Sequence, residues 1–95
     1  MALYRGDDLP PITINLVEDE GEVITKAEVI FNGGTIIKPF ENPTFPITVN
    51  ISANECKMLV VGRNVCNLVV YVDGKKITCD GALYFNLERE VSLAS

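Results

Sequence analysis

The feature that most constrains the fold is a pair of β-rich runs joined by Asp73-Gly74. An Asp-Gly pair between two such runs is typical of a two-residue hairpin turn. A turn of that length places Val72 opposite Lys75 and, further back, Cys66 opposite Gly81; directly opposed residues share one face of the sheet. This register predicts an inward apolar face formed by Cys66, Leu68, Val70, Val72, Ile77 and Cys79. The opposite face then carries Asn67, Val69, Tyr71, Lys76 and Thr78.

Shorter segments elsewhere show the same alternation of apolar and polar residues, which predicts further strands. The expected inward residues are Ile12, Ile14 and Leu16 in segment 12–17, Ala27, Val29 and Phe31 in segment 26–31, and Ile47, Val49 and Ile51 in segment 46–51. Two tight turns are expected, at Glu18–Glu22 and at Asn32-Gly33-Gly34, which leads into a strand at 35–38. An irregular loop is expected around Pro39, Pro43 and Pro46.

Ser52-Ala-Asn-Glu55 predicts a helix start, because the Ser and Glu side chains can cap each other's backbone N–H groups. We expect a short helical turn up to Val60, with Met58 and Leu59 buried and Gly62 ending it. Further on, Ile77, Cys79, Leu83, Phe85 and Leu87 all occupy odd positions. We therefore expect one extended strand through Asp80-Gly81, with Gly81 at a bulge or close approach, rather than a second hairpin.

The pattern as a whole predicts a single all-β domain over residues 1–95. We expect an antiparallel β-sandwich of about six to eight strands, with one short helical turn near residues 53–60. Apolar residues at 47% of the chain provide a core for such a domain.

Composition argues against several classes of function. The net charge of −5 disfavours nucleic acid and anionic membranes as partners. The chain has no histidine, so the usual general base is missing; we expect no catalytic residues, cofactor or metal site. Cys56, Cys66 and Cys79 are expected as reduced core residues. No signal peptide or membrane span is visible at the N-terminus or elsewhere, and Arg5-Gly6-Asp7 is not expected to act as an adhesion motif.

The functional hypothesis rests on apolar and aromatic residues of the face opposite the core. Its members are Val65, Asn67, Val69, Tyr71 and Tyr84. Left uncovered, they would suit a partner protein or provide an aromatic platform for a sugar. The alternative is that a neighbouring loop or strand of the same chain covers them.

The order of these signals resembles the immunoglobulin-like β-sandwich module of phage tail and baseplate proteins, such as the N-terminal domain of upper baseplate proteins. The matching segments are Arg5–Ile14, Glu18–Gly21, Ala27–Phe31, Ser52–Glu55, Leu68–Val72, Asp73–Lys75 and Gly81–Phe85. They cover nearly the whole chain. The chain departs from the family in the entry to its second strand, Val23–Ala27.

The resemblance implies a non-enzymatic virion protein that assembles in the host cytoplasm into a tail or baseplate. Its partners would be other tail subunits or further copies of itself, and no active-site residues come with the family. A β-sandwich that binds a carbohydrate or another ligand through its tyrosines is the alternative function.

Overall fold

The computed structural model describes residues 2–16, 23–79 and 83–89, and this part of the chain contains seven strands and one short helix. The acidic turn expected at Glu18–Glu22 lies outside the described residues, as does Gly81. The elements in chain order are β1 (Ile12–Ile14), β2 (Ile24–Phe31), β3 (Ile36–Glu41), β4 (Ile47–Val49), α1 (Ala53–Cys56), β5 (Gly62–Val72), β6 (Lys75–Thr78) and β7 (Leu83–Leu87).

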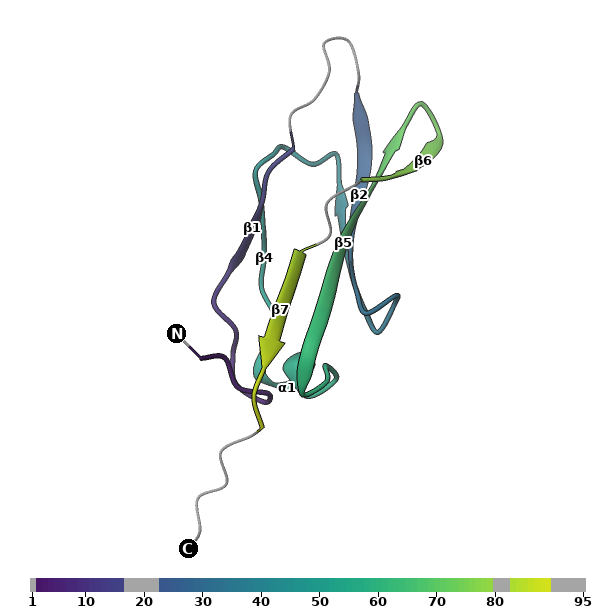
Figure 1. Cartoon of the computed structure of the whole chain (residues 1–95). Helices are drawn as coiled ribbons and strands as arrows, with labels where there is room; N and C mark the ends of the chain where they lie inside the picture. Colours follow the sequence, from purple (N-terminus) through teal and green to yellow (C-terminus); the bar gives the residue numbers. More distant parts are fainter. Residues whose placement is uncertain (1, 17–22, 80–82, 90–95) are drawn as a thin grey trace, which may run out of the picture.

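The strands form two antiparallel sheets that face each other (Figure 1). One sheet contains only β1 and β4. The other has the order β3-β2-β5-β6, with β7 also paired to β5, so that β5 is bonded to three other strands. The predicted all-β sandwich is therefore confirmed, with β5 as the central strand of the larger sheet.

The core lies between the two sheets and consists mainly of alternate residues of β2, β4 and β5. Ala27, Val29 and Phe31 are each 0% exposed in β2, and Ile47, Val49 and Ile51 are also buried, as the alternation predicts. Ile12, Ile14 and Leu16 are partly buried against this core. The rings of Phe31 and Phe85 meet edge to face, with centroids 6.3 Å apart. Apolar burial of this kind is the main source of stability for a domain without cross-links.

The Asp73-Gly74 hairpin has the predicted register, with Val72 opposite Lys75 and Val70 opposite Ile77. Asp73 has φ of 51° and Gly74 has φ of 76°, the two positive values that a type I′ turn requires. The burial predicted for Ile77 is wrong, since its side chain is 46% exposed. All four residues of β6 are exposed, because the facing sheet has only two strands and leaves this outer strand uncovered.

The prediction of one extended strand from Ile77 to Leu87 is also wrong. Its two ends form separate strands, β6 and β7, along the same edge of β5. Val70 lies opposite Ile77, and Cys66 lies opposite Leu83 instead of Gly81. The chain therefore advances six residues from Ile77 to Leu83 where β5 spans only four, from Val70 back to Cys66. Because the difference is an even number, the alternation survives it: Leu87 is buried and Phe85 partly buried as expected, whereas the burial expected for Leu83 is wrong, since its side chain is 46% exposed.

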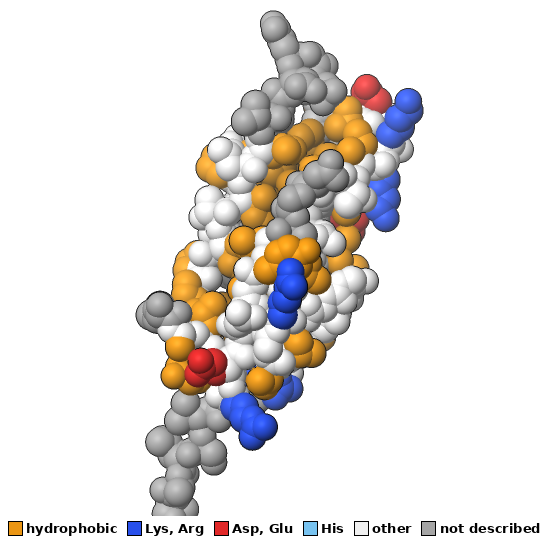
Figure 2. Space-filling model, in the orientation of Figure 1, with side chains coloured by type: hydrophobic (Ala, Val, Ile, Leu, Met, Phe, Trp, Pro, Cys, Tyr) orange, Lys and Arg blue, Asp and Glu red, His pale blue; other side chains and the backbone are white. Residues whose placement is uncertain are grey.

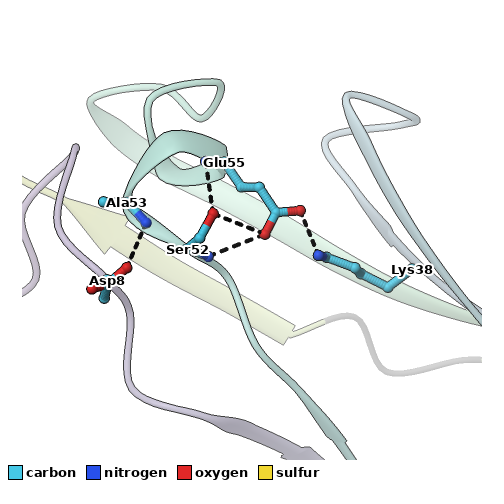
Figure 3. A network of polar contacts seen from close by, with 5 residues as sticks. All are labelled: Asp8, Lys38, Ser52, Ala53 and Glu55. Carbon is cyan, nitrogen blue, oxygen red and sulfur yellow. Dashed lines mark hydrogen bonds and ion pairs between the residues drawn. The ribbon is translucent and has the colours of Figure 1, made fainter.

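Helix α1 begins with the predicted capping box. The Ser52 hydroxyl accepts the Glu55 N–H at 3.3 Å, and the Glu55 carboxylate accepts the Ser52 N–H at 3.1 Å. Figure 3 shows two further contacts at this site: Asp8 accepts the Ala53 N–H at 2.6 Å, and Lys38 forms an ion pair with Glu55. The capping box thus joins the N-terminal segment to β3 at one end of the sandwich.

Two details near α1 and one in β3 differ from the predictions. The helix ends at Cys56 rather than near Val60, so helical spacing no longer applies to Met58, which is 54% exposed, whereas Leu59 is buried as predicted. Gly62 starts β5 and does not end the helix. Pro39 lies within β3 and not in a loop; β3 is an outer strand, where a residue without an N–H is tolerated.

Because Glu55 is ionised, part of the free energy of unfolding is expected to depend on pH. The hydrogen bond from Lys38, followed by that from the Ser52 backbone, lowers the pKa of Glu55 below its ordinary value of 4.5. A lowered folded-state pKa adds stability above the unfolded-state value, and this is lost as the pH falls through the folded-state value. Glu55→Gln should therefore cost about 0.5–1 kcal/mol at neutral pH and less at about pH 3. Urea unfolding of both proteins at the two pH values measures the difference; an equal cost at both would contradict it.

Candidate interaction surface

The five residues of the predicted interaction face all point away from the core, on the outer side of the larger sheet. Val65, Asn67, Val69 and Tyr71 alternate along β5 with the buried residues of that strand. Tyr84 lies in β7 directly opposite Val65, so the structure brings these two side chains together. Tyr84 is 53% exposed, whereas Val65, Asn67 and Tyr71 are half-buried.

Val69 is the member of this set for which exposure was wrongly expected. It is only 3% exposed, although it does not belong to the core cluster between the sheets. Glu28 of β2 lies directly opposite Val69, and the Tyr71 hydroxyl donates a hydrogen bond to the Glu28 carboxylate at 2.8 Å. This bond joins two side chains that flank Val69 on the outer side, which accounts for its burial in the middle of the sheet.

The surface extends onto β2 and β3, beyond the residues that the sequence singled out. Ile30 lies opposite Asn67 of β5, and Ile37 of β3 lies opposite Ile30. Ile37 is 48% exposed. We call Ile30, Ile37, Val65, Asn67 and Tyr84 the outer patch. The signal for the two isoleucines was available in the sequence: in Val29-Ile30-Phe31 and Ile36-Ile37, consecutive apolar residues must place one side chain on each face.

Charged side chains surround the two tyrosines. The Arg63 guanidinium lies 3.9 Å from the centroid of the Tyr84 ring, and the Lys26 ammonium lies 5.7 Å from that of Tyr71. The hydrogen bond to Glu28 raises the pKa of Tyr71, so its hydroxyl stays protonated as a donor. Each ring thus has a cation over one face. A sugar would stack on the same ring face that the cation covers. A ring beside a cation suits contact with a protein surface that carries both apolar and charged groups better.

The N-terminal Arg5-Gly6-Asp7 is held against α1 and the loop that follows it. The Arg5 guanidinium donates to the carbonyl oxygen of Leu59 at 2.8 Å and to that of Lys57, while the Gly6 N–H points at the Cys56 sulfur, 3.3 Å away. The Arg5 side chain therefore satisfies carbonyl groups just beyond the helix. An adhesion motif would need this side chain presented to a receptor.

The three cysteines lie in the core or against it. Cys56 and Cys66 are buried free thiols, and Cys79 is half-buried against the core. Burial raises the pKa of Cys66 to about 11, so the thiol is protonated at neutral pH and is a poor nucleophile. Among residues 2–16, 23–79 and 83–89, no group of three or more His, Cys, Asp or Glu side chains is placed to hold a metal ion. Within the same ranges, no helix has the length and apolar character that a membrane span requires.

A buried asparagine that the sequence reasoning missed fixes the loops at the base of the outer patch. Asn64 is 0% exposed and exchanges hydrogen bonds with the Val60 backbone, accepting its N–H at 3.1 Å and donating to its carbonyl at 2.9 Å. It also accepts a bond from Asn32 at 2.8 Å, and Asn32 accepts the Val65 N–H at 2.9 Å. The turn after β2 is thereby tied to the start of β5, which carries Val65.

Comparison with protein-family models, with curated proteins and with solved structures gives no match to this chain.

Proposed function

We propose that this chain is a non-enzymatic structural module that binds other proteins through the outer patch, as a subunit or adaptor of a phage tail or baseplate. The observation that carries the proposal is the outer patch itself. Exposed Ile37 and Tyr84 stand at its two sides, and Ile30, Asn67 and Val65 connect them. An apolar surface with a charged rim is the composition of many protein interfaces.

The tail or baseplate assignment rests on the resemblance in the order of the sequence motifs, together with the all-β sandwich that such a module would have. The module would join the virion after assembly in the host cytoplasm. Its partners would be other tail subunits, further copies of the chain, or both. The acidic net charge of −5 supports protein contacts over contacts with packaged nucleic acid.

The proposal is tested by measuring assembly of the wild-type chain and of two matched variants. The wild type is expected to form an oligomer, or a stable complex with a protein encoded beside it, in size-exclusion chromatography with light scattering. Ile37→Lys, in the outer patch, should weaken this assembly by about tenfold or more, which corresponds to roughly 1.4 kcal/mol.

Met58→Lys is the control, because Met58 is 54% exposed but lies in the loop after α1 and outside the outer patch. It should leave the assembly unchanged. A chain that stays monomeric and binds none of the proteins encoded beside it would contradict the proposal, as would an equal loss in the two variants.

A further inference from the structure

A second surface, which shares only Tyr84 with the outer patch, lies at the side of the molecule where the two sheets come together. It is an apolar groove between Leu83–Phe85 of β7 and the segment that leads into β1, where Leu3, Pro10, Pro11 and Ile12 line it. Figure 2 shows hydrophobic side chains exposed along this side of the molecule, with few charged side chains among them. We call it the edge groove.

The edge of β7 that faces the groove already begins a parallel ladder. The Arg5 N–H donates to the Glu88 carbonyl at 2.9 Å, and the Glu88 N–H donates to the Leu3 carbonyl at 2.8 Å. Tyr4 and Glu88 form a parallel bridge. Before Glu88, the described residues contain only one strand paired with Leu83–Leu87, namely β5 on the other side. A further strand running parallel to β7 would therefore continue a ladder that Leu3–Arg5 has started.

The outer strands of the larger sheet differ in how they are protected from added strands. Exposed β6 carries Lys75 and Lys76, and β3 contains Pro39, both of which are common devices against strand addition. Strand β7 has the sequence Leu-Tyr-Phe-Asn-Leu and carries neither a charge nor a proline. Of these three edges, only that of β7 has the composition of an edge that accepts a strand.

One end of the groove is acidic. It adjoins a second hollow lined by Asp7 and Asp8, and the two share Leu3, Leu9 and Pro10. Asp8 already accepts the Ala53 N–H, whereas Asp7 is exposed beside it. This end lies next to Glu88, where a strand parallel to β7 would have its C-terminal end. A cationic side chain there would meet two carboxylates.

We propose that the edge groove binds an extended segment of a partner protein as an additional strand, parallel to β7. The segment has apolar side chains at every second position, which enter the groove, and Lys or Arg at its C-terminal end, next to Asp7. This inference adds a second binding surface to the module proposed above. It rests on that proposed function only in taking a protein as the partner.

The test is a titration of the whole chain, followed by ¹⁵N NMR, with the amidated peptide acetyl-Thr-Val-Thr-Val-Thr-Val-Lys-Lys. Amide shifts are expected to change along β7 and from Leu3 to Ile12. A peptide with proline in place of each threonine lacks the N–H groups of the ladder and should not bind. A peptide ending in Glu-Glu should bind at least about tenfold more weakly.

Two protein variants separate binding in the groove from general effects. Leu83→Lys places a charge in the groove and should abolish binding. Ile77→Lys is the matched control, because both side chains are 46% exposed but Ile77 belongs to β6, outside the groove. Asp7→Lys should reverse the preference, so that the Glu-Glu peptide binds more tightly than the Lys-Lys peptide, a gain that a misfolded protein would not show.

The inference is overturned if the shifts fall on Ile30, Ile37, Val65 and Asn67 of the outer patch and not on β7, if the proline peptide binds as well as its parent, or if no shifts appear with the protein folded. It is equally overturned if Leu83→Lys instead dissociates a dimer, since the groove would then hold a second copy. Ile37→Lys should leave peptide binding unchanged, so a failure of the outer patch as an interface can be told apart from a failure of the groove.

Discussion

Phe31→Ala is expected to lower the free energy of unfolding by about 3–5 kcal/mol, the range for removing a buried aromatic ring. Phe31 is 0% exposed, and its ring packs edge to face with that of Phe85. The cost includes the lost apolar burial and the cavity that remains where strands on both sides hold the backbone in place. A domain of this size has a total stability of about 5–10 kcal/mol. The variant should therefore be largely unfolded in moderate urea, as measured by circular dichroism.

Ile37→Ala is the control for Phe31→Ala. Ile37 lies in the neighbouring strand β3 and is 48% exposed, so its truncation should cost less than about 1 kcal/mol. A cost for Phe31→Ala no greater than that of Ile37→Ala would mean that the core does not lie between the sheets as described.

Asn64→Asp is expected to cost about 2–4 kcal/mol although it changes a single atom. The Asn64 amide nitrogen donates to the Val60 carbonyl at 2.9 Å and to the Gly62 carbonyl at 3.2 Å. In the variant a carboxylate oxygen takes its place and faces two carbonyl oxygens at a position that is 0% exposed. The acid can relieve the repulsion only by becoming protonated, so part of the lost stability should return as the pH is lowered from neutral toward about 4.

The matched control is Asn86→Asp, which makes the same change in net charge at an exposed position of β7. It should alter the free energy of unfolding by less than about 0.5 kcal/mol in urea titrations at neutral pH. A similar cost for both variants would show that added negative charge, and not the buried site, is responsible.

The parts of the fold that depend on local chemistry were predictable from the sequence. Asp73-Gly74 determined both the turn and the register of β5 with β6, because few residues other than Gly, Asn and Asp adopt two successive positive φ values. The capping box at Ser52–Glu55 was predictable for the same reason, since both of its bonds lie within four residues.

The errors arose where burial depends on distant partners. Ile77 lies on the predicted face of the larger sheet, but no strand of the second sheet covers it. Val69 has the opposite face and is nevertheless buried, because Glu28 and Tyr71, which are 43 residues apart in the chain, form a bond beside it. Local alternation reports which face a residue occupies, whereas exposure depends on strand order in the sheet.

The same dependence on strand order extended the candidate surface. Ile30 and Ile37 join Val65 and Tyr84 only because β2 lies between β3 and β5. A hairpin of residues 62–78 alone does not show which strand lies on the far side of β5. Asn64 was missed for a related reason, since its main-chain partners are near in sequence but its burial is produced by the closed sandwich.

The central position of β5 has a consequence for the order in which the molecule forms during translation. Strand β1 pairs with β4, and β2 pairs with β5 on the side away from β3. Strands β1 and β2 therefore cannot form these pairs until residues much later in the chain have been synthesised. Only the β2–β3 hairpin can close early, because its two strands are near neighbours in the chain. The nascent N-terminal half must therefore keep Val29 and Phe31 accessible until β5 leaves the ribosome, which is the interval in which a chaperone would protect the chain.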